Sequence, residues 1–183
     1  MHAKTTTLIL FYSFFLCLLI VLLAGCSAKF FTYKGAWVAE DNRITVQDGK
    51  PYKGSWQTRD VTIDYTHQKK MQNLQISGEV KLRRFLTMGF GTLDNLTLNL
   101  YMLDPDGIVL DSKLIRIFAY RLDFHTLGKM TFNKQFELPA DTAAIAFGYS
   151  GRVSDGGGGI HGDKRGGQID WSFWKVPGRK PSE

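Results

Sequence analysis

The stretch Leu96-Thr97-Leu98-Asn99-Leu100-Tyr101-Met102 decides the fold class of this chain. Large apolar side chains occupy every second position, and polar or amphipathic residues lie between them. Since successive side chains of a β-strand point to opposite faces, this pattern places one face on a core and the other in water. The stretch therefore predicts a strand of an antiparallel sheet with one solvated face.

The same alternation recurs elsewhere in the chain and predicts several more strands. In each case apolar side chains fall on one face, and polar or charged side chains fall on the other. The segments concerned are 60–66, 74–82 and 130–138, with a shorter strand expected around Ile44 and Val46.

Two further segments, 114–120 and 143–150, are apolar or small on both faces. Because a strand that is covered on both faces needs no polar side, we predict that both are central strands. A last strand is predicted over 168–175, with Trp171 and Phe173 on the same side.

Turn sequences separate these segments. Asp104-Pro105-Asp106-Gly107 favours a tight turn, because proline fixes its own φ and glycine accepts a positive φ. Leu138-Pro139-Ala140-Asp141 marks another break, and no segment shows a long helical period. About eight short strands at this spacing predict an antiparallel β-sandwich, with a β-barrel as the alternative.

The segment from Arg83 to Gly91 breaks the alternation, since it is apolar without a period of two and ends in glycines. We interpret it as a short helix or crossover that closes one end of the core. The alternative is a loop that touches a membrane or a partner, because exposed apolar groups beside Arg83 and Arg84 suit an anionic interface.

The composition limits the number of domains, the partners and the cross-links that can be expected. The chain has 183 residues, of which 44% are hydrophobic, so one packed domain and a short additional segment are expected. The formal net charge is +6, but basic residues form no block longer than a pair, so we expect no nucleic-acid partner. The only cysteines are Cys17 and Cys26, which excludes a disulfide framework in the domain.

The N-terminal residues have the three parts of an export signal. A short basic start is followed by an apolar run from Leu8 to Leu23, and Ala24 and Gly25 then precede Cys26. The run is slightly long for a signal peptide, so a retained transmembrane anchor is the alternative. The ending Leu23-Ala24-Gly25-Cys26 resembles the lipobox of bacterial lipoproteins, and this resemblance covers residues 1–26 only.

The resemblance implies that the Cys26 thiol receives a diacylglyceryl group and that a peptidase cleaves just before it. Ser27 is similar to the residue after the cysteine in outer-membrane lipoproteins, so it favours the outer over the inner membrane. We therefore expect a lipid-anchored protein that faces the periplasm. The predicted organisation is a signal peptide (1–25), a lipidated N-terminus and tether (26–55), a β-sandwich (56–176) and a tail (177–183).

A glycine-rich loop is predicted over 150–167. Its candidate ligand or partner residues are Asp155, His161, Asp163 and Arg165. Their spacing matches no metal motif, and the adjacent cations oppose a bound metal ion, so neither a metal nor another cofactor is expected. The loop also lacks the pattern of a phosphate-binding P-loop.

No catalytic constellation is evident. The chain has no Gly-x-Ser-x-Gly motif and no cysteine outside the N-terminal segment, so we expect it not to be an enzyme. His67 and His125 stand among polar and charged neighbours, and His125 with Asp123 is interpreted as an exposed pair. Core and edge packing is the preferred interpretation of the tryptophans, with stacking on sugars as the alternative; they are Trp37, Trp56, Trp171 and Trp174.

These patterns favour a non-catalytic role. We expect an envelope lipoprotein whose sandwich binds or stabilises a membrane-associated protein partner. The alternative is capture of a glycan or a cation by the 150–167 loop.

Overall fold

The computed structural model describes residues 33–122, 128–155 and 169–180. The chain divides into two compact units, residues 1–32 and residues 33–183, and every described residue belongs to the second unit.

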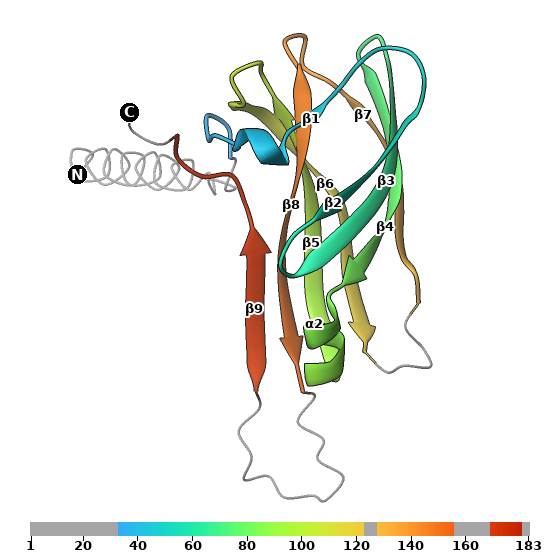
Figure 1. The fold of residues 1–183 in the computed structure, drawn as a ribbon, viewed down its shortest axis with the longest axis vertical. Coiled ribbons are helices and arrows are strands. Elements are labelled where there is room, and N and C mark those ends of the chain that lie inside the picture. Colours follow the sequence, from blue (N-terminus) through green and yellow to red (C-terminus); the bar gives the residue numbers. More distant parts are fainter. Residues whose placement is uncertain (1–32, 123–127, 156–168, 181–183) are drawn as a thin grey trace, which may run out of the picture. The chain divides into compact units, whose positions relative to one another are not determined.

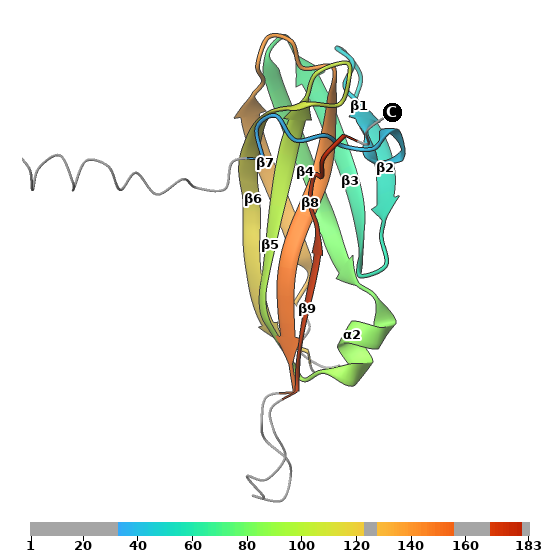
Figure 2. The same ribbon diagram turned by 90° about the vertical axis from the view of Figure 1, so that its left-hand side faces the viewer.

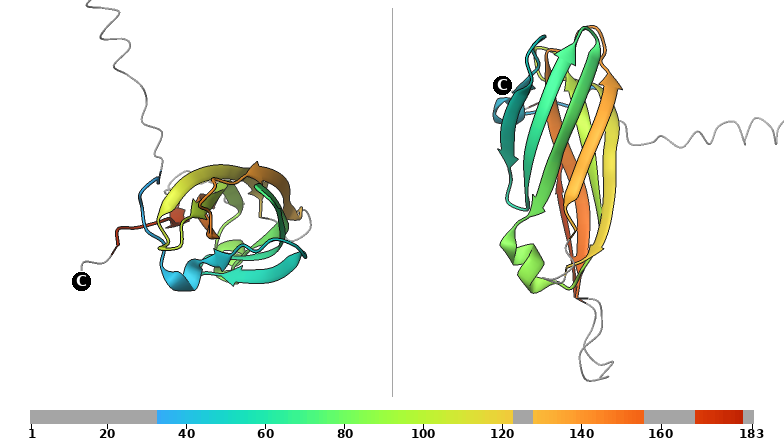
Figure 3. Two further views of the ribbon diagram at one scale, coloured as in Figure 1. Left: turned by 90° about the horizontal axis from the view of Figure 1, so that it is seen from above. Right: turned by 90° about the vertical axis from the view of Figure 1, so that its right-hand side faces the viewer.

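The second unit is an antiparallel β-sandwich of a five-stranded and a four-stranded sheet, as predicted, and it does not close into a barrel (Figures 1 and 3). In the five-stranded sheet β6 (Val109–Arg121), β5 (Thr92–Leu103) and β8 (Ala144–Ser154) follow one another, and both β1 (Ile44–Thr45) and β9 (Asp170–Lys175) pair with β8. The four-stranded sheet has the order β2 (Tyr52–Gln57), β3 (Val61–Lys70), β4 (Asn73–Leu82) and β7 (Met130–Glu137).

The main core lies between the inner faces of the two sheets. The predicted alternation is confirmed on β5, where Leu96, Leu98 and Leu100 are fully buried. On β3 the pattern of burial also repeats every second residue, beginning at Val61. A row of aromatic rings extends along the core, with Phe147 of β8 in contact with several of them. Burial of these apolar side chains is the main source of the stability of the sandwich.

A second, smaller cluster covers the outer face of the five-stranded sheet. Residues 33–38 cross this face, and the amide of Val38 donates to the carbonyl of Gly107 at 2.9 Å. The cluster is built from these buried side chains: Val38, Tyr101, Leu103, Val109, Ala144 and Ala146. The alternation rule assigned this face to water, but here the segment 33–38 excludes water from it.

The domain boundaries therefore differ from the predicted ones. The tether was expected to end at residue 55, but the compact unit begins at Tyr33, and Val38 and Val46 are already buried. The first residues of the predicted tail also pack on the sandwich, because Trp37 and Gly178 exchange backbone hydrogen bonds of 2.9 Å. Residues 33–55 mix aromatic and polar side chains, so nothing in the sequence indicated that they pack on the domain. Their packing depends on a surface formed by distant strands.

Of the two strands predicted to be central, one is at an edge of its sheet, so that prediction is wrong. β8 is central, and its outer-facing residues from Ala144 to Ser150 are small, as expected. β6 instead forms an edge of the sheet, with Leu114 50% and Ile117 57% exposed. Only part of its apolar surface faces the core, and shifts of register in the β5–β6 pairing interrupt the alternation.

The connections follow the sequence predictions more closely. Gly107 has a φ of +84°, and its amide donates to the Asp104 carbonyl at 3.1 Å, which confirms the turn between β5 and β6. The segment after Arg83 forms α2 (Arg84–Gly89), which lies at one end of the sandwich (Figure 2). Leu86 of this helix is fully buried, which confirms that the helix covers the end of the core.

Candidate functional site

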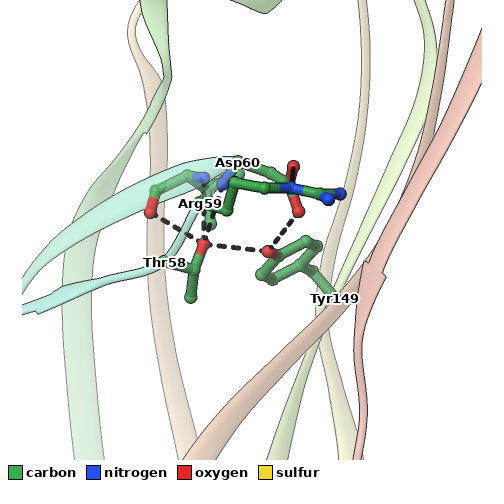
Figure 4. A network of polar contacts seen from close by, with 5 residues as sticks. Thr58, Arg59, Asp60 and Tyr149 are labelled. Atoms are coloured by element: carbon green, nitrogen blue, oxygen red, sulfur yellow. Dashed lines mark hydrogen bonds and ion pairs between the residues drawn. The ribbon is translucent and has the colours of Figure 1, made fainter.

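A buried polar network joins the two sheets near the start of β3 (Figure 4). Tyr149 of β8 donates its hydroxyl to Asp60 Oδ2 at 2.9 Å and lies 2.8 Å from Thr58 Oγ1. Arg59 Nε is 3.0 Å from Asp60 Oδ1, and Asp60 is only 2% exposed. Burial raises the pKa of Tyr149. Asp60 and Tyr149 are buried and, of the residues in the network, only Arg59 is exposed, so the network is a structural link between the sheets.

A cavity of about 630 Å³ lies beside β1, β2 and the segment that joins them. The three strands contribute Thr45, Tyr52, Tyr65 and His67 among its lining residues. Since β1 belongs to one sheet and β2 to the other, the cavity lies where the chain crosses between the sheets. A volume of this size is within the range of small-molecule sites.

Aromatic rings form one side of this cavity. The Tyr52 and His67 rings have centroids 5.3 Å apart, and the Tyr65 ring is stacked on His67 at 5.9 Å with an interplanar angle of 19°. Tyr52 is 56% exposed, whereas Tyr65 is buried. Gly54 makes this arrangement possible, because a Cβ at that position would lie 2.5 Å from the Tyr65 hydroxyl oxygen. Burial raises the pKa of Tyr65 to about 12.

His67 is the histidine of the cavity. The side chain is only 3% exposed, and its Nδ1 has no hydrogen-bond partner among the described residues. Burial lowers the pKa of His67, and this effect outweighs the opposing interaction with the Thr45 backbone. The imidazole is therefore neutral near pH 7.

Two cations, Arg43 and Lys50, lie along the same cavity. Arg43 is held in place, since its Nε donates to the Val38 carbonyl at 2.9 Å and its Nη2 donates to the Asp106 carbonyl at 2.7 Å. The one acidic lining residue, Asp48, is 3.5 Å from Lys69 Nζ. The cavity therefore combines aromatic surface with an excess of positive charge.

A second candidate surface is the free edge of β9. This strand pairs with β8 on one side and has no strand partner on the other among the described residues (Figure 1). Four exposed apolar side chains lie on β9 and on the residues that flank it. They are Ile169, Trp171, Trp174 and Val176, which are 65%, 46%, 64% and 36% exposed. Phe173, by contrast, is buried against Gly151.

Of the four candidate residues of the predicted loop 150–167, only Asp155 is described, and residues 150–154 belong to β8 instead of the loop. It follows β8, where its amide donates to the Ile169 carbonyl at 3.1 Å and its Oδ2 accepts from the Ile169 amide at 3.4 Å. These contacts hold together the two ends of the glycine-rich loop. The other candidate residues of that loop, His161, Asp163 and Arg165, lie outside the described residues, as do Lys164 and the predicted lipidation site Cys26.

The sequence interpretation missed the cavity. His67 was grouped with its polar neighbours, but the two-residue period of β3 places it on the same face as Ile63 and Tyr65. That period was the available signal. The partners from β1 and β2 could not be found in the same way, because their proximity depends on the crossing between sheets. His125 and Asp123 lie outside the described residues.

Comparisons with protein-family models, with curated proteins and with solved structures find no match to this chain. Within residues 33–122, 128–155 and 169–180 there is no helix long and apolar enough to span a membrane. The same residues contain no group of three or more His, Cys, Asp or Glu side chains placed to hold a metal ion.

Proposed function

We propose that this protein is a non-catalytic envelope lipoprotein, anchored by lipid on Cys26 and facing the periplasm, with the outer membrane favoured. Its sandwich binds a membrane-associated protein through the edge of β9. The partner contributes an extended segment that adds a strand to the five-stranded sheet. The lipobox-like ending at Cys26 supports the anchor, and the exposed edge with its tryptophans supports the binding mode.

The exposed edge of β9 is the observation that carries the binding mode. In an antiparallel strand alternate residues direct their N–H and C=O groups away from the neighbouring strand, so β9 offers these groups to a further strand. Trp171 and Trp174 lie on opposite faces of β9 and would flank an added strand on both sides. Large aromatic side chains of this kind dominate binding energy at protein interfaces.

The other sheet edges are less open to a partner. At β6, Arg116 Nη1 donates to the Thr131 carbonyl of β7 at 2.8 Å, which joins these two edges. β2 is preceded by Pro51, and Gly54 weakens its tendency to pair. β9 is therefore the edge that accepts a strand most readily.

The basic residues at and after the end of β9 indicate the charge of the partner segment. Lys175 ends β9, and Arg179 and Lys180 follow four and five residues later; none of the three forms an ion pair with another described residue. An added segment that carries acidic side chains next to apolar ones would match this surface. We therefore expect an extended, acidic and apolar segment as the binding element.

Site-specific photo-cross-linking in the native host tests the proposed interface. A photoreactive amino acid at Ser172 of β9 is expected to give one discrete adduct with an envelope protein, and the same probe at Gln135 of β7 serves as the control. The additional substitution Trp174→Asp should remove the adduct. Equal adducts from both positions, or an adduct that Trp174→Asp leaves unchanged, would contradict the proposal. An adduct with the mass of two copies of this chain would identify self-association instead.

A further inference from the structure

We infer that the cavity beside β1 and β2 binds an acidic saccharide, that is, a sugar unit bearing a carboxylate. This site is separate from the β9 edge, and its residues are Arg43 before β1 and members of β1, β2, β3 and the segment between β1 and β2. The inference stands on the size of the cavity, its aromatic side, its charge and the unpaired polar atom beneath it.

The volume fits a short glycan. A cavity of about 630 Å³ is large for a single ion and within the range of sites that hold small organic molecules. Its lining mixes polar and apolar side chains, including Gln47 and Pro51. A saccharide matches such a lining, because each ring has apolar C–H faces and a rim of hydroxyl groups.

Tyr52 supplies the surface on which a sugar ring can lie. More than half of this side chain is exposed, and its ring is held against His67 with centroids 5.3 Å apart. The Tyr65 ring, stacked on His67, supports the platform from below. The platform is thus positioned before a ligand arrives, which reduces the entropy lost on binding.

The cations select for a negative group. Lys50 is exposed and forms no ion pair with another described residue, so it is the cation open to a ligand. The Arg43 guanidinium donates to the Val38 and Asp106 carbonyls and lies 5.7 Å from the centroid of the Trp37 ring, so it adds positive charge without being free to move. The Asp48 carboxylate is 3.5 Å from Lys69, which offsets its charge. A carboxylate on the sugar would therefore meet an uncompensated positive potential and accept charge-assisted hydrogen bonds.

His67 adds a hydrogen-bonding group at the base of the cavity. Its Nδ1 is buried and has no partner among the described residues, although such atoms are paired in most folded proteins. A hydroxyl group would satisfy this nitrogen if a small shift of the lining side chains exposed it. The aromatic surface, the cations and this atom together match a hydroxylated, negatively charged ligand better than a purely apolar one.

Calorimetric titration of the protein, purified from membranes in detergent, tests the inference with two disaccharides that differ in one group. Cellobiouronic acid carries a carboxylate where cellobiose carries a hydroxymethyl group. We expect saturable binding of the acid with a Kd of about 1 mM or below, and binding of cellobiose at least about tenfold weaker. Equal affinity for both sugars, or no binding of the acid at about 10 mM, would overturn the inference.

Three variants assign the binding to this cavity. Tyr52→Ala should weaken binding of the acid about tenfold or more, and Lys50→Gln should reduce its affinity to that of cellobiose. Lys53→Gln removes a neighbouring lysine that does not line the cavity and should leave both affinities unchanged. Melting temperatures show that each variant is folded, and affinity for the acid that Tyr52→Ala does not change would contradict the assignment.

Discussion

Two buried tyrosines of the five-stranded sheet have opposite hydrogen-bonding situations. The hydroxyl of Tyr149 donates to Asp60, whereas the hydroxyl of Tyr101 is buried and has no partner among the described residues. Each side chain is 1% exposed, so the amount of buried ring surface does not distinguish them. The free-energy contribution of each hydroxyl should therefore depend on its partners alone.

The substitutions Tyr149→Phe and Tyr101→Phe should consequently have different effects on stability. Tyr149→Phe removes a donor from a buried carboxylate and is expected to lower the free energy of unfolding by about 1–3 kcal/mol. Tyr101→Phe removes an unsatisfied hydroxyl and is expected to leave that free energy unchanged or to raise it by about 1 kcal/mol. Urea denaturation of both variants measures the difference, and equal losses would contradict the assigned contacts.

His67 should make the stability depend on pH. Because burial lowers its pKa in the folded state, the unfolded chain binds the proton at a higher pH than the folded chain. The stabilising contribution is thus fully present above the usual histidine pKa of 6.5 and is lost as the pH falls through the lower folded value. One proton changes the free energy of unfolding by at most about 1.4 kcal/mol per pH unit.

The comparison of His67→Phe with the unmodified protein isolates this contribution. The variant keeps an aromatic ring and removes the titration, so its free energy of unfolding should fall less between about pH 7 and about pH 5.5. Denaturant unfolding at several pH values gives the measurement. Parallel pH profiles for both proteins would show that His67 is not responsible.

For a single residue, the sequence predicts which face of its strand the side chain occupies but not which distant residues it contacts. The period of β3 assigns His67 to the inner face, and the period of β5 assigns Tyr101 to the outer one. The outer face of β5 was expected to contact water, yet Tyr101 is buried beneath the segment 33–38. That contact joins residues far apart in the chain, and no local pattern encodes it.

Among the elements, β9 depends on one small residue of its neighbour. Gly151 is paired with Phe173, and a Cβ at Gly151 would lie 2.5 Å from the Phe173 ring. Since Phe173 is buried, its ring has little room to move away. The glycine therefore lets β9 pack closely on β8.

Gly151→Ala should weaken the attachment of β9. We expect a loss of about 1–3 kcal/mol in the free energy of unfolding, because the added methyl group displaces the ring. Ser150→Ala, at the adjacent exposed position of the same strand, is the control and should have little effect. Hydrogen exchange of the β9 amides should become faster in Gly151→Ala alone, and equal exchange in both variants would contradict this explanation.

The position of each strand within its sheet was harder to predict than the strand itself. The sequence analysis expected the short helix and every strand except β2, which falls largely within the predicted tether. Hydrophobicity did not distinguish the edge strand β6 from the central strand β8. Both carry apolar side chains on both faces. What separates them is residue size, since the outer face of β8 has Ala144, Ala146 and Gly148, which other residues can cover closely.

For the whole molecule, the anchor is the property that can be tested most directly. If Cys26 is the lipidation site, Cys26→Ser should block both lipidation and cleavage, and the unprocessed precursor should accumulate. Intact mass spectrometry of the membrane fraction from the native host distinguishes the two forms. A mutant chain of the normal mature mass would contradict the lipobox assignment, and an unmodified full-length mass in the unmutated protein would indicate a retained transmembrane anchor.

The class of fold was accessible from the sequence because it depends on a repeated local pattern. The cavity was not, because its lining joins strands of different sheets through the crossing segment that begins after β1. The β9 edge was accessible in part. The last strand was predicted, but core and edge packing was the preferred interpretation of its tryptophans, whereas Trp171 and Trp174 are exposed. The absence of a further strand beside them among the described residues depends on the topology.

The backbone pairing of Trp37 with Gly178 has a mechanical consequence. A protein tied to a membrane at one end and to a partner elsewhere carries tension along its chain. The chain enters the sandwich through residues 33–38, which are hydrogen-bonded to Gly107, Val109 and Gly178, all in or next to the five-stranded sheet. Tension between the proposed anchor and a partner on β9 would therefore pass through this one sheet, while the sheet that bears the aromatic side of the cavity would remain unstrained.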